Sequence, residues 1–180
     1  MKKMLVLDID QTLVDSSIRE NLSYFRDELN LEHYKKQKFH PVLGIASDSL
    51  LPLGHWLEAN AKKYDFVLCT ARQFEYIDFE YIDFESLYAL MPSTLDNALH
   101  IMCRNNSLDY GGNTCEASDK YKLPLLNWVK ANYNRELVVI DDCRKVLDMA
   151  ALQGHNLVDA RDLWHLSESD IMGIIENAIT

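Results

Sequence analysis

Short apolar runs alternate with longer amphipathic segments along this chain, and the alternation restricts the folds open to it. The short runs have the length of buried strands, and the segments between them carry apolar residues at helical spacing. Such alternation places parallel strands in one sheet, joined by right-handed crossovers. The sequence therefore predicts a doubly wound, Rossmann-like α/β fold with helices on both faces of a parallel sheet. The predicted strands are residues 4–9, 65–70, 100–103, 137–140 and 155–158, and the predicted helices are residues 47–64, 74–90, 124–133 and 144–152.

Length and charge limit the function classes. The chain has 180 residues, which suits one domain, and its formal net charge is −10. That charge argues against a broad, sequence-independent grip on nucleic acid, although it leaves contact with a nucleic-acid end open. The apolar runs are short, so we expect neither a membrane span nor an export signal. The four cysteines match no zinc spacing, and we expect reduced thiols in a cytoplasmic protein.

Two segments depart from the strand–helix rhythm. Residues 11–46 carry no strand pattern, and we expect one domain over residues 1–180 in which they form a small, mostly helical, cap-like insertion. Residues 105–119 are polar and predict a long loop, which in a compact domain is usually functional. Residues 74–78 (Phe-Glu-Tyr-Ile-Asp) recur as residues 79–83. A tandem duplication in a surface helix and a binding role for it both stay open.

Acidic residues follow two of the predicted strands at their carboxyl ends, where ligands bind in sheets of this kind. Asp8 and Asp10 follow the first strand and point the same way. Asp141 and Asp142 follow the strand at residues 137–140. Carboxylates this close repel unless a proton or a cation lies between them, and Mg²⁺ prefers such oxygen ligands. Asp142 could instead cap the next helix, but a cap explains only one acid, so the sequence predicts a metal site.

Residues able to bind phosphate follow other strand ends. Thr70 ends a strand, and its hydroxyl can donate to a phosphate oxygen or cap a helix. Lys120 and Lys122 come just before Pro124, which predicts the first turn of a helix. A cation there suits an anion bound at the helix N-terminus, although one of the two lysines could be a solvated surface side chain. Arg104 follows the third strand and could reach the same pocket.

Four short motifs thus occur in order along the chain. They are Asp-x-Asp-x-Thr at residues 8–12, a threonine at a strand end, a lysine at a helix start and a late Asp-Asp pair. Together they cover nearly the whole chain and resemble the motifs of the haloacid dehalogenase (HAD) superfamily of phosphatases. Gln11 is a departure, because the family usually has Gly at that position.

A narrower similarity rests on Thr70-Ala71-Arg72 and Cys103-Arg104. With Lys122 and residues 140–144, these are similar to the 3′-phosphatase domain of bacteriophage polynucleotide kinase-phosphatases. The spacing from the lysine to the Asp pair favours Lys122 over Lys120. Thr70 stands where this subgroup often has Ser. The sequence has no phosphate-binding loop of the kinase type, so the resemblance implies a stand-alone phosphatase.

The resemblance implies a two-step phosphoryl transfer that depends on Mg²⁺. Asp8 would attack phosphorus as the nucleophile, and Asp10 would protonate the leaving group and then activate water. The metal ligands would be Asp8, Asp10 through its carbonyl, Asp141 and Asp142. The phosphate and substrate ligands would be Thr70, Arg72, Arg104 and Lys122.

Three functions stay open at this point. The first is a polynucleotide 3′-phosphatase acting on phosphorylated nucleic-acid ends, which Arg72, Arg104 and the subgroup similarity favour. The alternative is a HAD phosphatase for a free nucleotide or another small phosphoester, a 5′-nucleotidase-like enzyme, which the negative charge favours. The third is a phospho-accepting signalling domain like a response-regulator receiver, but receivers carry the acidic pair at the first strand and the phosphoacceptor at a middle strand. The sequence leaves DNA versus RNA and the oligomeric state open.

Overall fold

A five-stranded parallel sheet forms the centre of the protein. The computed structural model describes residues 2–18, 47–72, 74, 82–112 and 117–180. The strands are β1 (Met4–Leu7), β4 (Phe66–Cys69), β5 (Ile101–Met102), β6 (Leu137–Asp141) and β7 (Asn156–Asp159). Their order is β5-β4-β1-β6-β7, and every neighbouring pair runs parallel. This arrangement confirms the predicted doubly wound α/β fold.

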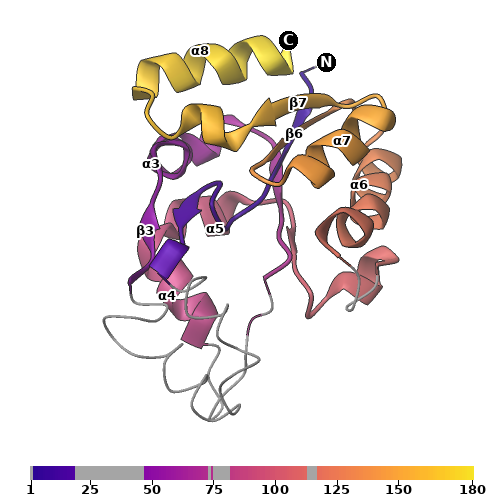
Figure 1. The fold of residues 1–180 in the computed structure, drawn as a ribbon, viewed down its shortest axis with the longest axis horizontal. Helices are drawn as coiled ribbons and strands as arrows, with labels where there is room; N and C mark the ends of the chain where they lie inside the picture. The colour runs from indigo at the N-terminus through magenta and orange to yellow at the C-terminus, as the bar shows by residue number, and fades with distance from the viewer. Residues whose placement is uncertain (1, 19–46, 73, 75–81, 113–116) are drawn as a thin grey trace.

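Two layers of helices cover the sheet, one on each face (Figure 1). One face is covered by α6 (Ser118–Tyr133) and α7 (Arg144–Leu152). The other is covered by α3 (Pro52–Asn60), α4 (Ile82–Leu90), α5 (Pro92–Asn97) and α8 (Glu168–Ile179). The described residues between these elements include the 3₁₀ turns η2 (Ala61–Lys63), η3 (Ser107–Tyr110) and η4 (Ala160–Leu163). Among the helices described, none combines the length and the apolar character that a bilayer crossing requires.

Side chains along the central strands alternate between two hydrophobic clusters. In β1, Met4 and Val6 pack with α6 and α7, whereas Leu5 and Leu7 pack with the cluster on the other face. Both faces are buried, so the strand reads as a continuous apolar run rather than as an alternating one. This burial is why the short runs could be recognised as strands from the sequence.

The helix that carries Lys122 begins earlier than predicted. Pro124 is typical of a first turn, but α6 begins at Ser118 and holds Pro124 in its interior. Tyr121 and Leu125, four residues apart, are fully buried against the sheet. Their packing outweighs the one backbone hydrogen bond that the proline removes. Lys122 therefore lies within the helix rather than before it.

The segment predicted as an insertion contains a short strand. Val14–Asp15 forms β2, which pairs antiparallel with Ser49–Leu50 (β3) and so joins the two ends of the segment. The expectation of no strand between residues 11 and 46 is therefore wrong at this point. Residues 19–46 lie outside the described residues, so the single domain with a helical, cap-like insertion stays a prediction.

Three further elements differ from the predicted ones. The helix predicted at residues 47–64 begins at Pro52, because the residues before it form β3. The segment between the predicted helix at residues 74–90 and the predicted strand at residues 100–103 contains α5, which begins at Pro92 and whose first N–H groups are accepted by the Glu58 carboxylate. The C-terminal helix α8, capped by Ser167, was not predicted. Most of the tandem repeat, residues 75–81, lies outside the described residues.

Candidate active site

Three neighbouring strands bring the motif residues to one edge of the sheet. Asp8 follows β1, and its N–H donates to the carbonyl of Ile140 in β6 at 3.0 Å, which sets it beside Asp141. Thr70 follows β4, and its N–H donates to the carbonyl of Met102 in β5 at 2.9 Å. The carboxyl ends of parallel strands meet at a single edge, which explains why residues 62 or more positions apart converge here.

Lys122 bridges the acids of two strands. Its Nζ lies 3.0 Å from Asp8 Oδ2 and 2.7 Å from Asp141 Oδ2, and its side chain is only 3% exposed. We call Asp8, Lys122 and Asp141 the lysine centre. Lys120, the other candidate from the sequence, is exposed. The structure thus brings Lys122, and not Lys120, to the acidic strand ends, as the motif spacing favoured.

Burial sets the protonation behaviour of the lysine centre. Removal from water raises the pKa of Asp8 to about 7, with Lys122 opposing the rise and Asp141 adding to it. Burial by itself would lower the pKa of Lys122, but the two carboxylates beside it outweigh burial and raise that pKa. Lys122 therefore favours the charged form of Asp8, and a second cation would favour that form further.

The acidic residues fit a hard divalent ion. Asp8, Asp141 and Asp142 each offer a carboxylate oxygen, and these three oxygens lie within 4.8 Å of one another. Asp8 Oδ1 is buried and has no hydrogen-bond partner among the described residues, so one oxygen of the nucleophile candidate is left for a ligand. Oxygen-only ligands of this kind suit Mg²⁺. The cluster is typical of the magnesium site of HAD phosphatases.

Asp142 does not cap the helix that follows it. The N-cap of α7 is Cys143, and no side chain caps that helix. Instead, Asp141 Oδ1 accepts the N–H of Cys143 at 2.9 Å, which fixes the turn after β6. The capping explanation for Asp142 is therefore wrong, and its carboxylate stands beside the lysine centre.

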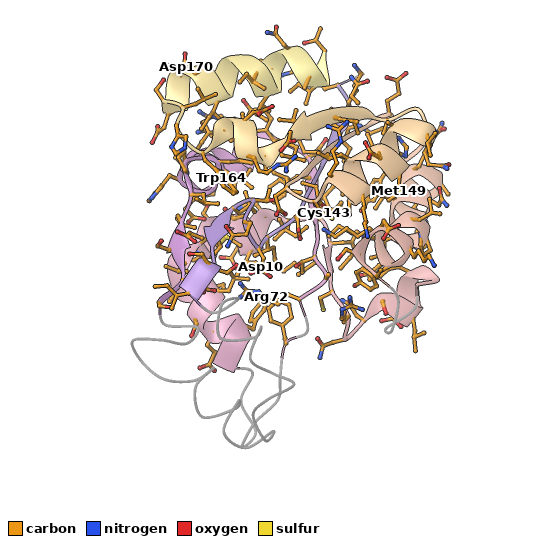
Figure 2. All side chains as sticks on the ribbon, in the orientation of Figure 1. Asp10, Arg72, Cys143, Met149, Trp164 and Asp170 are labelled. Atoms are coloured by element: carbon orange, nitrogen blue, oxygen red, sulfur yellow. The ribbon has the colours of Figure 1, made fainter. Side chains whose placement is uncertain are left out.

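A second cation, Arg72, lies between two further carboxylates. Arg72 Nε and Nη2 donate to Asp10 Oδ2 and Oδ1 at 3.2 and 2.5 Å, and Nη2 also donates to Asp48 Oδ2 at 3.0 Å. We call Asp10, Arg72 and Asp48 the arginine centre. Figure 2 shows Asp10 and Arg72 side by side at the edge of the sheet. Asp48 belongs to no motif, and its separation of 24 residues from Arg72 gave the sequence no signal for this contact.

Thr70 and Arg104 hold the loop that carries Arg72. Thr70 Oγ1 accepts the N–H of Arg72 at 3.0 Å, and no described helix starts there, so Thr70 is not a helix cap. Arg104 Nε donates to the carbonyl of Ala71 at 2.8 Å, and its guanidinium lies 4.8 Å from the centre of the Tyr121 ring. Both residues predicted to bind phosphate thus also support the loop after β4.

The backbone between the two centres adopts a left-handed turn at Gln11. Its φ is 56°, a conformation that favours glycine and explains why the family usually has Gly there. Trp164 Nε1 donates to the Gln11 carbonyl at 3.0 Å, and the Gln11 side-chain oxygen accepts the backbone N–H of Ser17 at 2.9 Å. Trp164, which follows η4, was not recognised from the sequence because 153 residues separate it from this turn.

Sequence comparison identifies the family. The model of the family described as "Bacteriophage T5 5′-deoxynucleotidase" matches residues 1–180, and the chain therefore belongs to that family. No curated protein matches the chain. This family agrees better with the predicted alternative, a 5′-nucleotidase-like enzyme, than with the polynucleotide 3′-phosphatase.

Structure comparison identifies the fold. A HAD-like hydrolase from Streptococcus pneumoniae has a TM-score of 0.60 at 13% identity, covering 96% of this chain and 98% of its own. A candidate phosphoglycolate phosphatase from Lactobacillus plantarum has a TM-score of 0.57 at 15% identity, covering 97% and 99%. CbbY from Rhodobacter sphaeroides, solved with phosphate, has a TM-score of 0.51 at 15% identity, covering 87% and 85%. The chain has a HAD-like hydrolase fold, as the sequence predicted, and the family to which it belongs is one of phosphohydrolases.

Proposed function

We propose that this member of the 5′-deoxynucleotidase family is a Mg²⁺-dependent phosphatase that hydrolyses deoxynucleoside 5′-monophosphates through a phosphorylated Asp8. The observation that carries the proposal is the lysine centre. It sets a buried lysine between two carboxylates at the sheet edge and leaves one oxygen of Asp8 without a hydrogen bond among the described residues. The family match supplies the class of substrate.

The contacts of the arginines support a free nucleotide over a nucleic-acid end. In the sequence, Arg72 and Arg104 favoured a polynucleotide 3′-phosphatase. In the structure, however, Arg72 pairs with two carboxylates and Arg104 stacks on Tyr121. A polynucleotide would need cations directed at backbone phosphates, and the net charge of −10 opposes that use. A small monophosphate needs only the cations of the site itself.

The first step transfers the phosphoryl group to the protein. A carboxylate oxygen of Asp8 attacks phosphorus and forms a new P–O bond, while the bond from phosphorus to the 5′ oxygen breaks. For this step Asp10 would have to leave Arg72 and take up a proton, which it then gives to that oxygen as the nucleoside leaves. Lys122 and the Thr70 hydroxyl hold phosphoryl oxygens during the transfer. Mg²⁺ held by Asp8, Asp141, Asp142 and the Asp10 carbonyl would neutralise charge on the phosphoryl group.

The second step regenerates the free carboxylate. A water molecule attacks phosphorus, Asp10 accepts a proton from that water, and the P–O bond to Asp8 breaks to release inorganic phosphate. Asp10 thus returns to its protonated state and is ready for the next substrate. Both steps require the Asp10 carboxylate to face the phosphoryl group on the side opposite Asp8, which is the in-line geometry of phosphoryl transfer.

A substrate panel tests the proposal. The full chain is incubated with Mg²⁺ and a deoxynucleoside 5′-monophosphate, its 3′-monophosphate isomer or a 3′-phosphorylated oligonucleotide, and phosphate release is measured. We expect kcat/KM for the 5′-monophosphate to exceed the other two by at least about tenfold, equivalent to about 1.4 kcal/mol of transition-state binding. EDTA should abolish release. The variant Asp8→Asn should lower kcat/KM by at least about 10³-fold, because an amide cannot act as the nucleophile.

Asp65→Asn provides a matched control. Asp65 also pairs with an arginine, Arg135, at 2.6 Å, but it lies just before β4, at the opposite edge of the sheet. This variant should keep wild-type activity. Preferred hydrolysis of the 3′-phosphorylated oligonucleotide would refute this proposal in favour of a polynucleotide 3′-phosphatase. Full activity in EDTA would refute the metal site.

A further inference from the structure

We propose that Asn105 is a positioning residue that fixes the loop after β4 and so presents the Thr70 hydroxyl to the phosphoryl group. The inference rests on the proposed function, because Thr70 is one of the residues that hold phosphoryl oxygens in that reaction. Asn105 itself contacts neither the phosphoryl group nor the metal. It acts through Phe74, the residue at which it ties the loop after β4 to the turn after β5.

The Thr70 hydroxyl is buried and has a hydrogen to donate. Thr70 directly follows β4 and is 1% exposed. Its Oγ1 accepts the N–H of Arg72 at 3.0 Å, but no residue in the described part of the chain accepts a hydrogen bond from it. Because a buried donor without an acceptor is costly, a ligand oxygen is expected beside this hydroxyl. The loop can serve phosphate in this way only if it holds the hydroxyl in one place.

The Asn105 side chain binds both backbone groups of Phe74. Its Oδ1 accepts the Phe74 N–H at 2.8 Å, and its Nδ2 donates to the Phe74 carbonyl at 2.7 Å. An amide can make this pair of bonds because it carries an acceptor and a donor side by side. The pair fixes the orientation of the Phe74 backbone, since a rotation that keeps one of the bonds breaks the other.

The loop that carries the hydroxyl is thereby held at both ends. At one end the Thr70 N–H donates to the carbonyl of Met102 in β5 at 2.9 Å, and at the other end Asn105 binds Phe74. Between them, the N–H and the Nε of Arg104 donate to two loop carbonyls at 3.2 and 2.8 Å. All of these contacts come from β5 or from the turn after it. The position of the hydroxyl is therefore set from the β5 side.

The turn that carries Asn105 is fixed by contacts of its own. Asn106 Oδ1 accepts the Cys103 N–H at 2.8 Å, and Asn106 Nδ2 donates to the Ile101 carbonyl at 2.8 Å. Neither bond involves the Asn105 side chain, so the turn should stay folded when that side chain is removed. Because Asn105 is exposed, its removal also opens no cavity in the core.

The experiment measures the binding of inorganic phosphate. The full chain and Asn105→Ala are titrated with phosphate by calorimetry in the presence of Mg²⁺. In addition, kcat/KM is measured for two esters, a deoxynucleoside 5′-monophosphate and p-nitrophenyl phosphate. They share the phosphoryl group but differ in the leaving group, because p-nitrophenolate is a far weaker base than a nucleoside alkoxide and leaves without a proton.

Asn105→Ala should weaken phosphate binding and slow both esters alike. A hydrogen bond to a charged group corresponds to about tenfold in binding or more, and loosening the loop should lose most of it. We therefore expect the phosphate Kd to rise, and kcat/KM for each ester to fall, by at least about fivefold. A merely structural role would reduce the fraction of folded protein, which lowers kcat but leaves the Kd of the folded fraction unchanged.

Two further variants make the test specific. Asn132 is also exposed, and its Nδ2 donates to a backbone carbonyl, that of Trp128 at 2.8 Å, at the opposite end of α6 from Lys122. Asn132→Ala should change neither the Kd nor kcat/KM. Thr70→Val removes the hydroxyl that Asn105 is proposed to position, so adding Asn105→Ala to it should raise the Kd by less than about twofold more.

An unchanged phosphate Kd in Asn105→Ala would overturn the inference, and so would losses that multiply in full in the double variant. If Asn105→Ala does not fold, Asn105→Gln makes the same test, because its longer side chain keeps the amide but cannot make both bonds to Phe74. A wild-type chain that binds no phosphate would refute both the proposed function and this inference. A wild-type chain that binds phosphate but prefers another ester would refute the proposed substrate alone, and the Kd in Asn105→Ala would still decide the role of Asn105.

Discussion

The lysine centre and the arginine centre both place one buried cation between two carboxylates, yet they are built from different parts of the fold. The lysine centre joins Asp8 and Asp141, which follow adjacent strands of the sheet, to a residue of α6. The arginine centre joins Asp10 to Arg72, in the loop after β4, and to Asp48, which lies just before β3 in the small β2–β3 sheet. The rigid sheet edge thus holds the proposed nucleophile, and the loops hold the proposed proton donor.

The two cations also differ in what they can do. The ammonium of Lys122 is a point charge that can move from one oxygen to another, as a group that follows a migrating phosphoryl oxygen should. The guanidinium of Arg72 is a planar fork that fixes the direction of one carboxylate. The lysine centre is therefore suited to stabilising charge, and the arginine centre is suited to holding a charged carboxylate in place.

Removing the cation of the lysine centre should have the largest effect. Lys122→Ala takes away a donor to the transferring phosphoryl group, so kcat/KM for both esters should fall by at least about 100-fold. It also leaves two buried carboxylates without their partner, at a cost in unfolding free energy of about 3 kcal/mol or more in the metal-free protein. Steady-state kinetics and urea unfolding measure the two effects.

Lys120→Ala is the matched control for that prediction. Lys120 lies in the same helix but is exposed, so its removal should change kcat/KM by less than about twofold. Comparable losses at the two lysines would mean that the phosphate contact has been assigned two residues away from its true place.

The pH dependence of the unfolding free energy should reveal the cost of burying the charged form of Asp8 in the lysine centre. The pKa of Asp8 rises from an ordinary value of 3.8 to about 7 on folding, so between these values the folded state binds more protons than the unfolded state. In EDTA, the unfolding free energy of the wild type should therefore fall relative to that of Asp8→Asn as pH rises from about 4 to about 7. Urea unfolding of both proteins across this range measures the difference. Parallel curves would refute the assigned burial of the Asp8 charge.

The turn that links the two centres should give the smallest effect. Trp164→Phe keeps the ring packing but removes the hydrogen bond to the Gln11 carbonyl, at a cost of about 1 kcal/mol in unfolding free energy. Because this bond holds the backbone next to Asp10, we expect a larger loss of kcat/KM on the nucleotide than on p-nitrophenyl phosphate. A loss on p-nitrophenyl phosphate alone would show that Trp164 supports the lysine centre instead.

The difference between the centres also explains how much the sequence could predict. Asp8, Thr70 and Asp141 were predictable because each ends a buried apolar run, and parallel strands bring such ends together. Lys122 was selected by its spacing to the Asp pair, although the helix start at Pro124 was wrong because packing of α6 on the sheet outweighs the preference of proline.

The arginine centre could not be predicted in the same way. Asp10 and Arg72 were recognised as motif residues, but their contact with each other was not, and Asp48 carries no local signal at all. An ion pair between loops depends on how separate segments pack, and no periodicity in the sequence reports that. The Trp164 contact with Gln11 was missed for the same reason.

Trapping of a phosphorylated protein tests the central claim most directly. With p-nitrophenyl phosphate, Asp10→Asn should still transfer the phosphoryl group to Asp8, because this leaving group needs no proton, but should then hydrolyse the intermediate slowly. Rapid acid quenching and peptide mass measurement should find about one phosphate per chain on the peptide that contains Asp8, matched by a burst of p-nitrophenolate. Asp8→Asn should give neither. Release of p-nitrophenolate by Asp10→Asn without any phosphorylated protein, or with phosphate on another residue, would contradict the account.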